Sequence, residues 1–95
     1  MSSTSASRIG RKRITLECRA EPGHDVFVAG TFNDWNPHRK SMRAVDNDGG
    51  YRAVLMLAPG DYEYKFVVDG TWRVDGDNPR WAPNAFGSLN SVVSV

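Results

Sequence analysis

The chain has 95 residues, enough for one domain, and its 40% hydrophobic and 24% charged residues are ordinary for a soluble globular protein. Its formal net charge of +1 gives no overall attraction to nucleic acid or to an anionic membrane, and its single cysteine excludes an intramolecular disulfide. No apolar run approaches the ~18 residues of a membrane-spanning helix and no apolar secretory segment opens the chain, so we expect a cytoplasmic protein.

The N-terminal residues are rich in serine and basic side chains, and they are too poor in apolar ones to offset the entropy of ordering. We therefore expect residues 1–13 to form a disordered tail and residues 14–95 to form one folded module. The basic cluster at residues 8–13 is typical of a solvated leader, although it could also contact an acidic partner.

From Ile14 to Ala20 apolar and polar residues alternate with the period of two that is typical of a half-buried β-strand. Cys18 fits this pattern as a small buried side chain. Further strands are predicted for residues 25–30, 40–45 and 51–57, separated by turn sequences rich in Gly, Pro, Asn and Asp. The second half of the strand at 51–57 is apolar on both faces, which predicts a central position in its sheet.

The clearest strand, residues 62–68, leads into the two-residue turn Asp69-Gly70, which favours a type I′ hairpin. In such a hairpin Val67 lies opposite Trp72, and cross-strand partners point to the same face of the sheet. The other face of this strand carries its Tyr and Phe side chains and should turn to the core. Trp72 is therefore predicted to be exposed beside Lys65, and an exposed indole usually marks a binding surface.

The remaining aromatic residues leave more than one interpretation open. Trp35 lies in a polar, turn-rich loop, where both core packing and ligand contact are possible, while Phe32 in the same loop is the better candidate for the core. Trp81 stays undecided within a long loop predicted for residues 75–89. A final strand is expected at residues 90–95.

About seven short strands, with no helical period and no internal repeat, predict an all-β fold. Turn signals every ~8–12 residues indicate an antiparallel, immunoglobulin-like β-sandwich.

Three separated motifs carry a family resemblance: Thr31-Phe32-Asn33-Asp34-Trp35, Tyr64-Lys65-Phe66-Val67-Val68-Asp69-Gly70-Thr71-Trp72 and Gly87-Ser88-Leu89-Asn90-Ser91-Val92-Val93. In this order they resemble the family 48 carbohydrate-binding modules, and most nearly the glycogen-binding domain of the AMP-activated protein kinase beta subunit. The resemblance covers the chain from about Ile14 to Val95. It implies non-catalytic binding of an α-1,4-linked glucan such as glycogen, starch or a maltooligosaccharide. It also implies that the module targets an associated glycogen-active enzyme or protein kinase subunit to the polysaccharide.

The same resemblance implies which residues bind the sugar. Trp35 and Trp72 match the two aromatic surfaces on which sugar rings stack. Lys65 and Asn90 match residues that hydrogen-bond sugar hydroxyls.

Two more candidates come from the last loop. Phe86 falls where a residue, often leucine, reaches into the sugar, and Ser88 falls where a small hydroxyl residue lies nearby. The chain departs from the family pattern just before this loop, since Asp75-Gly76 stands where Asp-Pro is common and the loop to Phe86 is about one residue longer.

Other function classes are less well supported by the residues. The carboxylates fall in turns or on a flat sheet face and His24 and His38 stand alone in loops, so we expect no catalytic residue, metal site or cofactor. A protein-interaction module of the same fold, which docks on a catalytic partner without binding sugar, is the alternative. Basic residues with aromatics could also bind single-stranded nucleic acid, but the neutral domain argues against a nucleic-acid or membrane partner.

Overall fold

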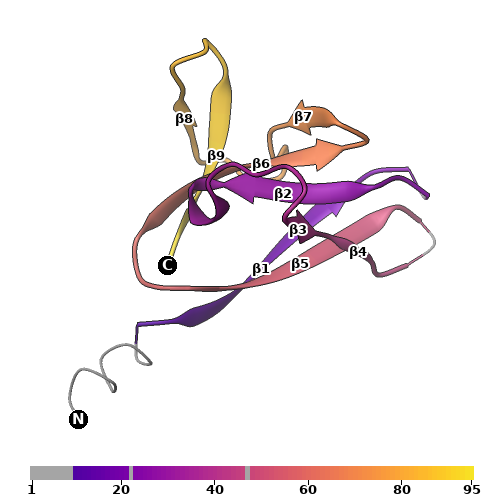
Figure 1. Ribbon diagram of the computed structural model, residues 1–95, viewed down its shortest axis with the longest axis horizontal. Coiled ribbons are helices and arrows are strands. Elements are labelled where there is room, and N and C mark those ends of the chain that lie inside the picture. The colour runs from indigo at the N-terminus through magenta and orange to yellow at the C-terminus, as the bar shows by residue number, and fades with distance from the viewer. Residues whose placement is uncertain (1–9, 22, 47) are drawn as a thin grey trace.

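The computed structural model describes residues 10–21, 23–46 and 48–95, and these form nine β-strands and one short 3-10 helix (Figure 1). In chain order the elements are β1 (Lys12–Arg19), β2 (Val26–Gly30), η1 (Thr31–Asn33), β3 (Lys40–Ser41), β4 (Arg43–Ala44), β5 (Gly50–Leu57), β6 (Asp61–Val68), β7 (Thr71–Arg73), β8 (Trp81–Pro83) and β9 (Leu89–Ser94). Within the described ranges no helix is long and apolar enough to cross a membrane.

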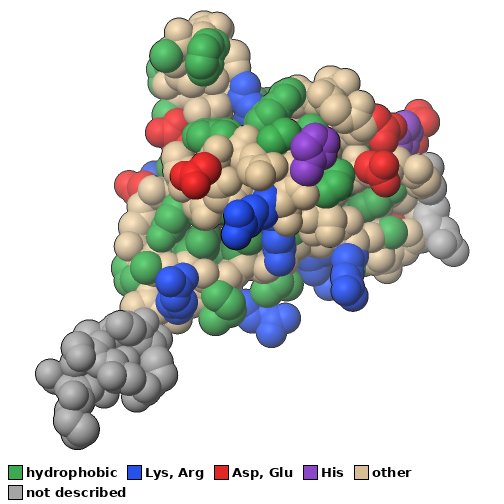
Figure 2. All heavy atoms as spheres, in the orientation of Figure 1, with side chains coloured by type: hydrophobic (Ala, Val, Ile, Leu, Met, Phe, Trp, Pro, Cys, Tyr) green, Lys and Arg blue, Asp and Glu red, His purple; other side chains and the backbone are tan. Residues whose placement is uncertain are grey.

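The strands form two antiparallel sheets, which confirms the predicted all-β sandwich. The smaller sheet has the order β1-β5-β4, so β5 is central as predicted, and the larger sheet has the order β3-β2-β6-β9-β8. Lysine and arginine side chains gather on the side of the molecule formed by β1, β4 and β5 (Figure 2). A narrow arm, residues 81–91 of β8, β9 and their connecting loop, projects from the body and carries hydrophobic side chains at its tip (Figures 1 and 2).

The larger sheet is organised around β6, which pairs with three strands. One edge of β6 pairs with β2 along residues 64–68. The opposite edge is shared, because β9 pairs along residues 61–64 and β7 pairs along residues 66–68. Lys65 therefore lies where the partner on this edge changes from β9 to β7.

The core fills the space between the two sheets, and strand alternation determines which side chains enter it. Tyr64, Phe66 and Val68 of β6 are buried on the inner face, as the sequence predicted. Cys18 is buried in the same core, and this burial raises the pKa of its thiol. Phe32 packs partly buried against the core, as expected.

Three sequence-based expectations differ from the structure by more than one residue. The predicted strand at 40–45 is two short strands, because the chain crosses between the sheets at Met42: β3 pairs with β2, β4 pairs with β5, and the Met42 side chain is buried between them. The predicted loop at 75–89 contains β8, a short edge strand that tolerates Pro83 because one of its edges is unpaired. The first strand begins at Lys12 rather than Ile14, and the predicted disorder of residues 1–13 falls mainly on residues outside the described ranges.

Gly30, the last residue of β2, is closely packed where the strand leads into the loop that carries Trp35. A Cβ at Gly30 would lie 2.4 Å from the backbone oxygen of Glu63 and 2.6 Å from the Phe32 ring. We expect Gly30→Ala to lower the free energy of unfolding by about 1–3 kcal/mol through overpacking. Gly76→Ala is the matched control, because a Cβ there meets nothing within 4 Å. Equal urea-unfolding curves for the two variants would contradict this prediction.

Candidate functional site

An open groove of about 410 Å³ lies on the outer face of the larger sheet. It is lined by side chains from η1 and its following loop, from β6 and β7, and from the arm: Thr31, Trp35, Glu63, Lys65, Trp72, Asn84, Phe86, Ser88 and Asn90. All six site residues that the sequence singled out are among them. The structure therefore brings these six residues together, although the first, Trp35, and the last, Asn90, are 55 positions apart in the chain.

The β6–β7 hairpin presents Trp72 to the groove, as its sequence predicted. Both turn residues have positive φ, 48° for Asp69 and 83° for Gly70, as a type I′ turn requires. Val67 pairs with Trp72, so the indole stands on the outer face, where it is 43% exposed. Val67 shares that face but is buried between its two cross-strand neighbours, Phe27 and Trp72.

The hairpin turn is tied to the loop before β2 through the side chain of Asp69. Its Oδ1 accepts a hydrogen bond from the backbone N–H of Asp25 at 2.9 Å, and its Oδ2 pairs with Nδ1 of His24. The hydrogen bond with Asp69 raises the pKa of His24. The backbone N–H of Asp25, and then His24, lower the pKa of Asp69.

The loop after η1 holds Trp35 in an uncommon backbone conformation. The amide of Asn33 accepts from the N–H of Gly30 at 3.0 Å and donates to the carbonyl of Val28 at 3.1 Å, which fastens the loop to β2. The N–H of Trp35 then donates to the carbonyl of Gly30 at 2.9 Å. Asp34 and Trp35 have φ of 56° and 59°, a left-handed conformation that costs roughly 1–3 kcal/mol for each non-glycine residue. Such strain at a surface indole is typical of functional sites.

The two indoles form the most specific geometry in the groove. The ring centroids of Trp35 and Trp72 lie 6.5 Å apart, and the ring planes are inclined by 43°. Trp35 is half-buried and Trp72 is exposed, so each keeps part of its flat surface open to solvent. A flexible ligand with apolar faces could contact both rings only if its own path bends.

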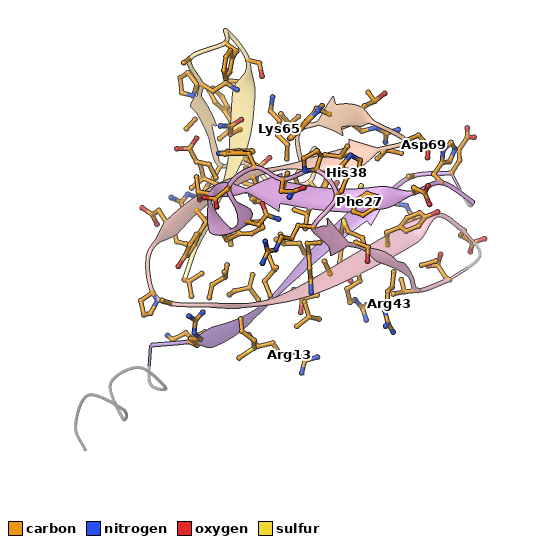
Figure 3. The ribbon with its side chains drawn as sticks, in the orientation of Figure 1. Arg13, Phe27, His38, Arg43, Lys65 and Asp69 are labelled. Carbon is orange, nitrogen blue, oxygen red and sulfur yellow. The ribbon has the colours of Figure 1, made fainter. Side chains whose placement is uncertain are left out.

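Lys65 rises from β6 between β7 and the arm (Figure 3). Its Nζ donates a hydrogen bond of 2.5 Å to Oγ of Ser88. An ammonium group has three donors, so this bond leaves two for a ligand. Lys65 is therefore a donor-only group beside the two indoles.

The arm loop is organised by Asn84, a residue outside the three sequence motifs. Its Oδ1 accepts from the backbone N–H groups of Phe86 and Ser88 at 2.9 and 3.1 Å. Its Nδ2 donates to Oγ of Ser88 at 3.1 Å and to Oδ1 of Asn90 at 3.0 Å. The turn sequence Pro83-Asn84-Ala85-Phe86-Gly87 contained a signal, because an asparagine side chain often accepts from the backbone two residues later.

Phe86 and Asn90, both in the arm, differ strongly in exposure. Phe86, at the tip, is 93% exposed, whereas Asn90 is only 6% exposed. The Asn90 amide accepts from Asn84 and donates from Nδ2 to Oε1 of Glu63 at 2.9 Å. Glu63 lies outside the residues that the family resemblance implied, although it stands two positions before Lys65 in the strand and therefore shares its outer face.

The groove combines inclined aromatic faces with hydrogen-bonding groups of both kinds. Lys65 only donates, the Glu63 carboxylate only accepts, and the Asn90 amide can do both. Among the described residues, no three His, Cys, Asp or Glu side chains gather as metal ligands. The arrangement can hold a neutral polyhydroxylated ligand whose rings have apolar faces.

Fold and groove define an all-β sandwich domain with an aromatic-lined groove on one sheet. The family model described as the glycogen recognition site of AMP-activated protein kinase matches residues 14–95. The chain therefore belongs to this family of carbohydrate-binding modules, as its motifs indicated. The matched family is a recognition module and not a catalytic domain.

Two curated relatives illustrate the range of proteins that contain such a module. The 5'-AMP-activated protein kinase subunit beta-2 of Mus musculus is 32% identical over 83 residues, which cover 87% of this chain and 29% of that protein. The protein FLOURY ENDOSPERM 6, chloroplastic, of Oryza sativa subsp. japonica is 36% identical over 76 residues, which cover 80% of this chain and 14% of that protein. The chain thus spans less than a third of the length of either relative.

A solved structure supports the fold alone. Enterochelin esterase from Shigella flexneri superposes with a TM-score of 0.66 at 14% sequence identity, covering 99% of this chain and 35% of that one.

The His24–Asp69 pair should make stability depend on pH in a defined window. Because the pKa of His24 is raised in the folded state, protonated His24 stabilises the fold. This stabilisation is fully present below the usual pKa of 6.5 and is lost as pH rises through the raised pKa. Because the pKa of Asp69 is lowered in the folded state, its ionised form also stabilises the fold. This stabilisation is present above the usual pKa of 3.8 and is lost as pH falls through the lowered pKa. We expect wild type to exceed His24→Gln in free energy of unfolding at about pH 5, and the difference to shrink by pH 8. Urea unfolding at both pH values measures this, and a constant difference would argue against the pair.

Proposed function

We propose that this chain binds an α-1,4-linked glucan, such as glycogen, starch or a maltooligosaccharide, in the groove on its larger sheet. The observation that carries the proposal is the pair of indoles, 6.5 Å apart and inclined by 43°, beside Lys65 and Asn90. Membership of a glycogen-recognition family supports the same ligand class.

The indoles supply the attraction for the sugar rings. A glucose ring has polar edges and two faces with patches of C–H bonds, and an indole laid against such a face buries apolar area from both partners. The electron-rich ring face also attracts the slightly positive C–H hydrogens. Because an α-1,4-linked chain curves, its successive rings can meet two inclined indoles, whereas a straight β-1,4-linked chain fits a flat array better.

The polar side chains orient the glucan on these rings. Lys65 donates to sugar hydroxyls with the two N–H groups that Ser88 does not use, and Asn90 contributes its amide edge. Phe86 at the tip of the arm also contacts the sugar, while the Ser88 hydroxyl holds the ammonium of Lys65 in place. These polar contacts select hydroxyl positions, and the aromatic contacts supply most of the buried apolar area.

The proposed role of the module is to hold an associated enzyme or kinase subunit on the polysaccharide. The groove is shallow and solvated, so we expect affinity for a single chain of about micromolar to millimolar, or ~4–8 kcal/mol. Many chain ends on one glycogen or starch particle raise the effective affinity through avidity. The module itself performs no catalysis in this proposal, and the cytoplasm is its proposed compartment.

Docking on a catalytic partner without sugar binding is the second candidate. It is favoured by the exposed apolar side chains of the arm, Trp81 at 59% and Phe86 at 93% exposure. The two functions differ in the use of the paired indoles, which only the sugar proposal requires to be open.

Tryptophan fluorescence can test the sugar proposal with little ambiguity. Trp81 lies outside the residues that line the groove, so in Trp81→Phe the remaining indole emission comes from Trp35 and Trp72. We expect this variant to respond saturably to maltoheptaose and β-cyclodextrin and not to cellohexaose. In calorimetric titrations, Trp35→Ala and Trp72→Ala should each lose ~1–3 kcal/mol of binding free energy, and Trp81→Phe should lose none. Wild-type affinity in both alanine variants would contradict the proposal. If the wild-type protein responds to none of these sugars, docking on a catalytic partner is favoured instead.

A further inference from the structure

Three polar side chains of the groove form a hydrogen-bond chain with one direction. Nδ2 of Asn84 donates to Oδ1 of Asn90 at 3.0 Å, and Nδ2 of Asn90 donates to Oε1 of Glu63 at 2.9 Å. Asn90 is 6% exposed in the middle of this chain. Its amide is therefore held on both sides by side chains from two different elements, the arm and β6.

Both ends of the chain enforce the same direction. An ionised Glu63 can only accept, so Asn90 must turn its Nδ2 toward β6. The Oδ1 of Asn84 is occupied by the backbone N–H groups of Phe86 and Ser88, so Asn84 must turn its Nδ2 toward Asn90. A reversed Asn90 amide would place two acceptors face to face at Glu63 and two donors face to face at Asn84.

We propose that Asn84 and Glu63 are positioning residues that fix the Asn90 amide in one orientation and thereby set glucan affinity. The inference rests on the proposed function of the groove. It deepens that proposal by assigning roles to two residues that neither the motifs nor the family match singles out.

The consequence for a ligand follows from the bonds that remain. An asparagine amide has two N–H donors and a carbonyl with two lone pairs. The two hydrogen bonds to Asn84 and Glu63 therefore leave Asn90 one free donor and one free acceptor site. The orientation of the amide decides which of these meets which sugar hydroxyl. Asn84 also holds the backbone of Phe86, so loss of its bonds disturbs a second groove residue at the same time.

The sharpest test reverses the direction of the hydrogen-bond chain while the net charge of the protein stays constant. Asn84→Asp keeps oxygens for the backbone N–H groups of Phe86 and Ser88 but leaves Asn90 between two acceptors. Glu63→Gln removes the negative charge and introduces an amide that can both donate and accept a hydrogen bond. In the double variant the amide introduced on β6 can donate to Oδ1 of a flipped Asn90, whose Nδ2 then donates to the carboxylate introduced in the arm. Every bond of the chain is thereby restored in the opposite direction.

We expect Asn84→Asp to weaken maltoheptaose binding at least about tenfold in calorimetric titrations, and Glu63→Gln to weaken it less than about threefold. In urea unfolding, the double variant should regain the stability that Asn84→Asp loses, because every bond is restored, which is the opposite of additive behaviour. Its maltoheptaose affinity should stay as low as that of Asn84→Asp, because the Asn90 amide is then fixed in the reversed orientation. Ala85→Asp is the matched control, because it adds the same charge at an exposed neighbouring position and removes none of these bonds; it should bind like wild type.

The outcomes separate the two proposals. If wild type does not bind maltoheptaose, the proposed function fails, and with it the role in affinity; the same variant cycle in urea unfolding then shows whether the directional chain itself exists. If wild type binds and Asn84→Asp binds equally well, only the positioning role is wrong. Wild-type affinity in the double variant, or equal losses of affinity in Ala85→Asp and Asn84→Asp, would also overturn it.

Discussion

The pairing of β6 with three strands is the constraint on which the groove depends. Because β7 and β9 share one edge of β6, the strands that carry Trp72 and Asn90 pair with β6 on either side of Lys65, β7 along residues 66–68 and β9 along residues 61–64. Strand alternation then separates the functions of β6 itself. The buried aromatic face holds the two sheets together, and the same alternation turns Glu63 and Lys65 outward. Packing of the core and orientation of the site are therefore consequences of one register.

The two loops that complete the groove are held by the same physical device. Asn33 fastens the Trp35 loop and Asn84 fastens the Phe86 loop, each with a side-chain amide that bonds to backbone groups of its neighbours. Such amides replace the ladder bonds that these segments lack outside a sheet. In the Trp35 loop these bonds add to the packing of Phe32 against the core, whereas the arm presents the almost fully exposed Phe86 ring mainly through them.

Much of this architecture could be predicted from the sequence because its signals are local. Period-two alternation located the main strands, and the Asp-Gly turn gave the register that places Trp72 beside Lys65. The features that escaped prediction depend on partners distant in the chain. Met42 separates two strands only because each finds a different sheet, and β8 forms a strand only because β9 lies beside it. The contact of Asn90 with Glu63 joins residues 27 positions apart, and no local pattern encodes it.

The contacts that hold the groove side chains in place also explain how the proposed site can be selective while remaining shallow. An open groove buries little of a ligand, so its contacts must already be in place to be useful. Lys65 is held by Ser88 and Asn90 is held from both sides, so binding need not order these side chains again. The strained backbone of Trp35 has its conformational cost met by folding, before any ligand arrives. In the proposed function, aromatic area supplies the modest attraction, and the prearranged polar groups restrict that attraction to chains whose curvature and hydroxyls fit.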